Sequence, residues 1–307
     1  MKTVKIGTRG SQLALYQANL VAEFLRKEKS EVEVELTTIK TTGDKILDSP
    51  LSKIGDKGLF TREIEKAILE DEIDCAVHSL KDLPTELPAG LKIAAFGKRE
   101  DVRDALIAQD NMKLLELPKG ATVATGSLRR RSQLLHLRSD LNLVDIRGNL
   151  NTRIRMLVEE GYAGILLACA GVKRLGMMDK VTEIFEPERM LPAVGQGIIA
   201  VEAREDDDQI SQLLRGFSDA DSESCALAER AFLHQLEGGC QVPIGVYTSV
   251  ERNLMTGIVA SLDGEEMVRD SVKFDRDSPE ESGQSLAERL VSLGAAKILE
   301  EIRNVSR

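Results

Sequence analysis

One cysteine of the chain differs from the other three in its surroundings. Cys240 follows two glycines and closely precedes a proline, which places it on a loop. Cys75, Cys169 and Cys225 lie in apolar strand or helix patterns, where a thiol is usually an inert core side chain. A loop thiol with backbone freedom around it can act as an attached nucleophile. The sequence therefore predicts that Cys240 is the reactive thiol.

A run of arginines lies between residues 125 and 155. This segment carries seven arginines, no lysine and two acids, so its local charge is +5 in a chain with a net charge of -10. The planar fork of arginine matches carboxylate or phosphate oxygens two at a time. Serine, threonine, glycine and asparagine accompany these arginines at expected strand ends, where open α/β sheets bind ligands and helix N-termini attract anions. The pattern predicts an anion-binding site formed from Arg129, Arg130, Arg131, Arg138, Arg147, Arg153 and Arg155.

A third feature is the segment HSLKDLP, which begins at His78. It places Lys81 beside Asp82 at the end of a short apolar strand. On the surface this would be an ordinary turn with an exposed ion pair. In an enclosed cleft, a carboxylate among cations can stabilise developing positive charge or move protons. From these residues alone, both interpretations stay open.

Metal and dinucleotide sites are disfavoured by spacing. The three histidines, His78, His136 and His234, have no recognised zinc spacing to the cysteines. The glycines around residue 196 do not follow a strand and open a helix as a dinucleotide fingerprint does. We predict no metal site.

Composition narrows the class of protein further. Aromatic residues are 3% and tryptophan is absent, which disfavours nucleic-acid modules that stack bases on aromatic rings. The net charge of -10 disfavours nucleic acid and anionic membranes as partners. The chain has neither the apolar run of a signal peptide near its start nor one long enough to span a bilayer. Four cysteines do not suggest a disulfide framework. We expect a cytoplasmic protein.

Short strands alternate with helices over the first 170 residues, a pattern typical of parallel α/β layers. The expected strands are 4–6, 32–38, 74–79, 122–125, 143–146 and 163–168. The expected helices are 13–24, 64–69, 128–137 and 150–160, and one face of the first contains Leu13, Gln17, Leu20, Val21 and Phe24. Residues 190–203 read as a crossover between two related lobes. After residue 219 the pattern indicates an α+β domain, with a helix at 223–235, antiparallel strands between 246 and 274 around an Asp263–Gly264 hairpin turn, and a long helix at 285–302.

Seven segments together resemble the hydroxymethylbilane synthase (porphobilinogen deaminase) family. They run from IGTRGSQLAL near the start through KGLFTREIE, HSLKDLPTELP, ATGSLRRRSQL, IRGNLNTRI and LPAVGQGIIAVE to GGCQVPIGVY. The last four, in this order, make a chance match implausible. Gly126 departs from the family pattern, in which serine is more frequent.

The resemblance implies an α/β fold of two lobes similar to type II periplasmic binding proteins, with mixed sheets, and a C-terminal α+β domain. Residues 1–98 with 198–216 would form the first lobe, 103–193 the second, and 219–307 the C-terminal domain. The two lobes would face each other across a cleft, with the loop of Cys240 at its mouth.

The resemblance also implies a transferase of porphyrin, tetrapyrrole and heme biosynthesis. Such an enzyme carries a dipyrromethane cofactor, linked here through a thioether to Cys240. It joins four porphobilinogen molecules with release of ammonia and hydrolyses off the linear hydroxymethylbilane. We expect a monomer whose partner is porphobilinogen, with no nucleic acid or membrane partner.

The family's functional positions match individual residues of this chain. Asp82 matches the catalytic carboxylate, which can hold pyrrole N–H groups and offset positive charge once ammonia leaves. Cofactor contacts match Ser79, Lys81, Thr125, Ser127, Arg129 and Arg130. Substrate contacts match Arg9, Ser11, Arg147, Arg153 and Arg174, together with Lys53 and Lys57 on a loop expected to cover the cleft.

Two other functions remain alternatives. A non-catalytic anion-binding module with the same lobes would explain the arginines, but it would need neither the Gly-Gly-Cys loop nor Asp82. A cysteine-dependent acyltransferase would need His234 oriented against Cys240, and the spacing does not demand that pair.

Overall fold

The computed structural model describes residues 2–28, 31–45, 58–237 and 242–305. Over these residues the chain divides into two compact units. Unit 1 contains residues 2–45, 58–100 and 195–226, and unit 2 contains residues 101–194 and 227–305. Lys53, Lys57 and Cys240 lie outside the described residues.

A five-stranded mixed sheet forms the centre of unit 1, with strand order β2-β1-β3-β10-β4. The strands β1, β2 and β3 are parallel, whereas β10 is antiparallel to both of its neighbours. Their bounds are Lys2–Thr8 (β1), Val32–Thr38 (β2), Cys75–Ser79 (β3), Leu91–Phe96 (β4) and Ile199–Arg204 (β10).

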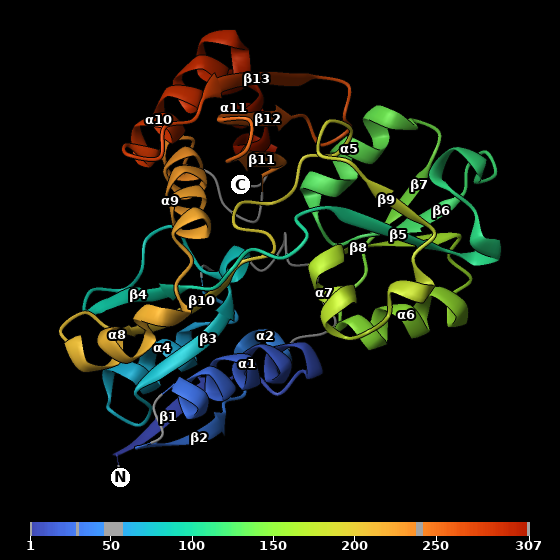
Figure 1. The fold of residues 1–307 in the computed structure, drawn as a ribbon. Coiled ribbons are helices and arrows are strands. Elements are labelled where there is room, and N and C mark those ends of the chain that lie inside the picture. The colour runs from blue at the N-terminus through green and yellow to red at the C-terminus, as the bar shows by residue number, and fades with distance from the viewer. Residues whose placement is uncertain (1, 29–30, 46–57, 238–241, 306–307) are drawn as a thin grey trace. The chain divides into compact units, whose positions relative to one another are not determined.

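Helices pack on both faces of this sheet (Figure 1). Alternate residues of the strands face α1 (Gln12–Glu28) and α8 (Asp208–Leu214) in one core cluster. The opposite face packs against α4 (Arg62–Leu69). A single turn, α2 (Thr42–Lys45), completes the unit's first half.

Unit 2 contains a second mixed sheet with the same kind of strand order, β7-β6-β8-β5-β9. Its strands β6, β7 and β8 are parallel, and β5 is antiparallel to β8 and β9. The bounds are Asp104–Ala108 (β5), Thr122–Ala124 (β6), Asn142–Val144 (β7), Gly164–Ala168 (β8) and Glu183–Phe185 (β9). Helix α5 (Leu128–Leu137) covers one face, and α6 (Leu150–Glu159) and α7 (Cys169–Arg174) cover the other (Figure 1).

The rest of unit 2 is a three-stranded antiparallel sheet with helices packed on it. Its strands are β11 (Ile244–Ser249), β12 (Leu254–Ala260) and β13 (Met267–Lys273). The helices are α9 (Ala220–Gln235), which begins in unit 1, α10 (Pro279–Leu290) and α11 (Ala296–Val305). Phe232, Leu286 and Leu290 belong to its apolar core.

These sheets confirm the predicted fold class of two α/β lobes with mixed sheets and a C-terminal α+β region. The Asp263–Gly264 turn between β12 and β13 is also confirmed, and Gly264 has the positive φ (+74°) that such a turn needs. The predicted single helix over 285–302 is wrong. A π-helical turn at Val291–Ala295 separates α10 from α11, and Gly294 has a φ of +107° there.

Two further findings concern the apolar character of the helices and the state of the cysteines. No helix in the described part of the chain is long and apolar enough to cross a bilayer. The cysteines that the structure describes, Cys75, Cys169 and Cys225, are buried free thiols, as predicted. Burial raises the pKa of Cys75 and of Cys169 to about 12, so these two thiols are poor nucleophiles.

Candidate functional site

The unit 1 candidates follow the carboxyl ends of two adjacent parallel strands, β1 and β3. Arg9 and Ser11 lie between β1 and α1, and the Ser11 hydroxyl accepts a hydrogen bond from the Ala14 amide at 3.2 Å. Such turns at the carboxyl edge of an open sheet are where α/β proteins bind ligands.

Arg9 has a partner that the sequence pattern did not suggest. Its Nε donates to Asp44 Oδ1 at 3.2 Å, and its guanidinium lies 4.2 Å from the centre of the Phe60 ring. Burial alone raises the pKa of Asp44, but the hydrogen bonds and charge of Arg9 outweigh burial and lower it. The Arg9 fork is therefore held in one orientation by a fixed carboxylate.

At the end of β3, Ser79 leads into a 3-10 turn, Leu80–Asp82, that carries Lys81 and Asp82. Gln17 of α1 is 2% exposed and donates through Nε2 to the Ser79 hydroxyl at 2.9 Å. Lys81 is half-buried and Asp82 is exposed. The turn thus presents the Asp82 carboxylate outward, while Gln17 fixes its root.

The unit 2 candidates follow the carboxyl ends of β6, β7 and β8, which are adjacent and parallel. Thr125 and Ser127 lie between β6 and α5, and the Ser127 hydroxyl caps that helix by accepting from the Arg130 amide at 3.4 Å. The Thr125 hydroxyl accepts from the Ser127 amide at 3.3 Å. This is the predicted strand-to-helix turn, with a helix N-terminus that favours anions.

Arg129 and Arg130 are both buried and both bind Asp104, which has no exposed surface. Arg129 Nη1 donates to Asp104 Oδ2 at 2.7 Å, and Arg130 donates to Oδ1 through Nε at 3.1 Å and Nη2 at 2.7 Å. Carbonyl oxygens of Leu191 and Leu166 accept from the same two guanidinium groups. Asp104 therefore offsets part of the positive charge that the local arginine count implied.

The electrostatics of this group follow from the burial of its three charges. Burial would raise the pKa of Asp104, but the two guanidinium groups outweigh it and hold the pKa well below its usual range. Burial lowers the pKa of Arg129, and Arg130 adds to that effect while Asp104 opposes it. Arg129 Nε is buried and has no hydrogen-bond partner among the described residues, so it retains donor capacity.

The remaining arginines of the run, and Arg174 beyond it, differ in their surroundings. Arg147, Arg153 and Arg174 are half-buried and lie on the β7–α6 loop, on α6 and at the end of α7. The Asn149 side chain caps α6 by accepting from the Thr152 amide at 2.9 Å. Arg153 donates through Nε to the Gly148 carbonyl at 2.9 Å. Arg131 binds the Leu143 carbonyl, Arg138 the Asp140 carboxylate and Arg155 the Glu159 carboxylate.

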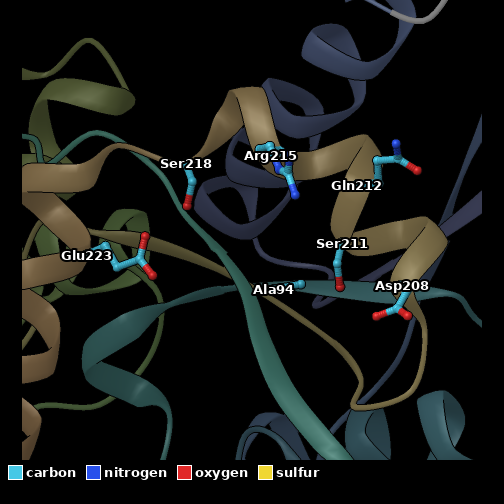
Figure 2. A pocket seen from close by; sticks show the side chains of 7 residues that line it. All are labelled: Ala94, Asp208, Ser211, Gln212, Arg215, Ser218 and Glu223. Atoms are coloured by element: carbon cyan, nitrogen blue, oxygen red, sulfur yellow. The ribbon is translucent and has the colours of Figure 1, made fainter.

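A separate shallow pocket in unit 1 contains none of these candidates. It has a volume of about 450 Å³ and lies over α8 and the start of α9 (Figure 2). Its lining consists of Ala94, Asp208, Ser211, Gln212, Arg215, Ser218 and Glu223. Acidic and basic side chains share this open surface without converging, so we assign it no function.

The fold and the site define a class: a protein of two α/β units, each with polar and cationic side chains at the carboxyl edge of its parallel strands. Family models identify the family. The porphobilinogen deaminase dipyrromethane cofactor binding domain matches residues 4–212, and the porphobilinogen deaminase C-terminal domain matches residues 224–292. The chain belongs to the porphobilinogen deaminase family, as its motifs predicted.

Curated relatives agree over the whole length of the chain. The porphobilinogen deaminase of Syntrophomonas wolfei is 52% identical over 305 residues, which cover 99% of this chain and 100% of the relative. That of Desulforamulus reducens is 51% identical over 302 residues, which cover 98% of both chains.

Among solved structures, the chain is similar to periplasmic binding proteins. The methionine-binding protein MetQ is 13% identical with a TM-score of 0.47, over 74% of this chain and 94% of that one. An arginine-specific periplasmic binding protein of Salmonella typhimurium is 14% identical with a TM-score of 0.42, over 73% of this chain and 94% of that one.

Proposed function

We propose that the chain is a hydroxymethylbilane synthase, which polymerises four porphobilinogen molecules into linear hydroxymethylbilane and releases ammonia. The observation that carries this proposal is the full-length match to porphobilinogen deaminases at about half identity. The alternative of a non-catalytic anion-binding module is not favoured, since the match extends through the C-terminal region.

The described residues of unit 2 fit an anionic cofactor such as dipyrromethane, whose rings carry carboxylates. The fit is supported by the unpartnered donor of Arg129, the capped N-terminus of α5 and the hydroxyls of Thr125 and Ser127. We propose that these groups, with Arg130, Ser79 and Lys81, hold the cofactor. When bound, it supplies a primer that stays attached to the protein, and we propose Cys240 as its anchor.

The substrate is also an anion, because porphobilinogen carries an acetate and a propionate. We propose that each forked guanidinium group binds both oxygens of one of these carboxylates. The arginines then position the ring through its side chains and do not contact the reacting carbons themselves. The proposed substrate contacts are Arg9, Ser11, Lys53, Lys57, Arg147, Arg153 and Arg174.

Asp82 is proposed as the catalytic residue. When ammonia leaves the substrate, positive charge spreads over the pyrrole ring and its N–H becomes more acidic. A carboxylate placed at that N–H accepts the hydrogen bond and stabilises the charge. The exposed position of Asp82 on the turn after β3 supports this role, because the carboxylate can meet a ligand without first breaking a buried contact.

We also propose the finer divisions of the molecule. The two lobes would be 1–98 with 198–216 and 103–193, and the C-terminal domain would be 219–307. The enzyme would work as a monomer in the cytoplasm.

Intact mass spectrometry of the purified protein tests this function. We expect wild type to carry an adduct of two pyrrole rings that is missing from Cys240→Ser and present in Cys225→Ser, a matched change at a buried thiol. An active wild-type protein of unmodified mass would refute the cofactor assignment.

Turnover of porphobilinogen then tests the roles of two further residues. Asp82→Asn should keep the adduct and lose nearly all turnover, and normal turnover in this variant would remove Asp82 from the mechanism. Arg147→Lys should slow elongation, because a point charge replaces a fork. Elongation at the wild-type rate in Arg147→Lys would contradict the bidentate argument.

A further inference from the structure

Three ionisable side chains meet inside unit 1, behind the turn that carries Asp82. They are Glu65 of α4, His78 of β3 and Glu202 of β10, with exposed fractions of 6%, 5% and 0%. Nε2 of His78 lies 3.1 Å from Oε2 of Glu202. Charged side chains are seldom buried so fully without a purpose, because removing them from water is costly.

Strand register explains why these side chains share one face of the sheet. β10 pairs antiparallel with β3, with Ala200 opposite His78 and Glu202 opposite Ala76. His78 and Glu202 are therefore diagonal neighbours on the same face. That face packs against α4, where Ile64 and Ile68 share an apolar cluster with Ala76.

The hydrogen bonding of this cluster is incomplete. No hydrogen-bond partner exists among the described residues for Glu65 Oε1, for His78 Nε2 or for either carboxylate oxygen of Glu202. The 3.1 Å approach of His78 Nε2 to Glu202 Oε2 is thus a close contact without hydrogen-bond alignment. The buried hydroxyl of Thr61 lies in the same region, close enough to Glu65 to lower its pKa.

The surroundings of Glu65 raise its pKa. Burial raises the pKa of Glu65; the Glu202 carboxylate raises it further, whereas Thr61, His78 and Arg62 lower it. Burial and the charge of Glu202 therefore both favour the protonated form of Glu65. From β4, the residue opposite Glu202 is the apolar Ile93. Arg62, Glu65 and His78 face Glu202 in this region. Two residues further along β10, Arg204 lies on the same face, but it donates to the carbonyls of Ile68 and Ile73 and pairs with Asp71, Asp74 and Asp207.

The cluster is connected to the active-site turn by one peptide bond. Because side chains alternate along β3, His78 points to the α4 side and Ser79 to the α1 side, where Gln17 binds it. The Leu80 amide then donates to the Ile198 carbonyl at 3.0 Å, just before β10. The root of the Asp82 turn is thus held by Gln17 on the α1 face and by the backbone just before β10.

We propose that Glu202 and His78 are positioning residues for the Asp82 turn, and that a proton on Glu65 keeps this pair in its working arrangement. This inference rests on the proposed catalytic role of Asp82. Loss of that proton at high pH places a second negative charge beside Glu202 and loosens the hold on β3. The catalytic carboxylate then moves relative to the substrate, and kcat falls while substrate binding persists.

The test is the pH profile of kcat for the cofactor-loaded enzyme. Glu65→Gln imitates the protonated acid, so it should turn over like wild type at neutral pH and move the alkaline limb upward by at least about half a pH unit. Glu202→Gln should lower kcat by about tenfold to a hundredfold with KM within about twofold, because small displacements of catalytic groups are costly. Glu205→Gln, the same change at an exposed position three residues away, should change neither.

The outcomes separate this inference from the proposed function. An alkaline limb in Glu65→Gln that coincides with wild type and Glu205→Gln overturns the proton assignment, even where Glu202→Gln does not fold. A folded Glu202→Gln with wild-type kcat overturns the positioning role. Normal turnover in Asp82→Asn removes the proposed role of Asp82 itself, whatever the cluster variants do.

Discussion

The buried Asp104 carboxylate gives the sharpest stability prediction. It has no exposed surface and accepts three hydrogen bonds from two buried guanidinium groups, those of Arg129 and Arg130. Asp104→Asn keeps the size of the side chain but leaves two adjacent cations buried without a counter-charge. Removing one partner of a buried ion pair costs about 3–5 kcal/mol. We therefore expect unit 2 to lose about 3–5 kcal/mol of unfolding free energy.

Urea unfolding followed by far-ultraviolet circular dichroism measures this loss, since the chain has no tryptophan to report by fluorescence. With a slope of about 3 kcal/mol per molar urea, the midpoint should fall by about 1–1.7 M. The matched control is Glu188→Gln, which breaks an exposed pair with Arg252, and its midpoint should stay within the error of the fit. A loss below about 1 kcal/mol in Asp104→Asn would refute the reasoning.

The same carboxylate predicts a pH dependence with a definite sign. The pKa of Asp104 is lowered in the folded chain, so its stabilisation is fully present above the unfolded pKa, about 4, and is lost as pH falls through the folded value. The difference between wild type and Asp104→Asn should therefore be constant from neutral pH to about pH 5 and shrink below about pH 4. A difference that grows on acidification would contradict this sign.

Three further predictions concern local contacts. Cys75 and Cys169, each with a pKa of about 12, should resist iodoacetamide at pH 8 in the folded protein and react in urea. Peptide mass measures the labelling, and labelling of the folded protein within minutes would contradict the burial argument. Asn149→Ala removes the α6 cap and should cost about 1 kcal/mol in urea unfolding; an unchanged midpoint would dismiss the cap. Gly264 and Gly161 both have a positive φ, but only at Gly264 would an added Cβ lie 2.3 Å from a carbonyl oxygen. Gly264→Ala should therefore lower the unfolding free energy by about 1–3 kcal/mol more than Gly161→Ala. Equal losses in the two variants would show that this contact relaxes freely.

Local patterns predicted the elements whose partners are close in the sequence. The helix at 128–137 agrees at both ends, because Ser127 caps it and apolar residues repeat along it. β10 was expected only as part of a crossover, since its pairing with β3 depends on residues more than a hundred positions away. The break at Gly294 was missed because apolar periodicity continues on both sides of one glycine.

Charge neutralisation explains what the sequence did not show about the site. The local charge of the arginine run was calculated from the acids inside its own segment. Asp104, on the strand β5 beside β8, lies outside that segment and binds two of its arginines. Arg9 is likewise held by Asp44, which lies 35 residues away. A linear window cannot show which acid a fold brings to which base. Gln17 did leave a signal, since it is a polar residue on an otherwise apolar helix face.

Both units place a buried carboxyl group beside a basic side chain, behind a turn that carries candidate site residues. In unit 2, a buried carboxylate holds two guanidinium groups behind a strand-to-helix turn, and an unpartnered N–H remains on Arg129. In unit 1, the buried Glu202 carboxyl group lies 3.1 Å from the His78 imidazole, behind the turn of Asp82. A surface side chain anchored by such a buried group loses less entropy on binding a ligand than one that moves freely. An enzyme that adds carboxylate-bearing rings one after another must bring each ring to the same reacting carbon, so it gains from rigid site residues at every addition. The buried ionisable groups are the physical source of that rigidity.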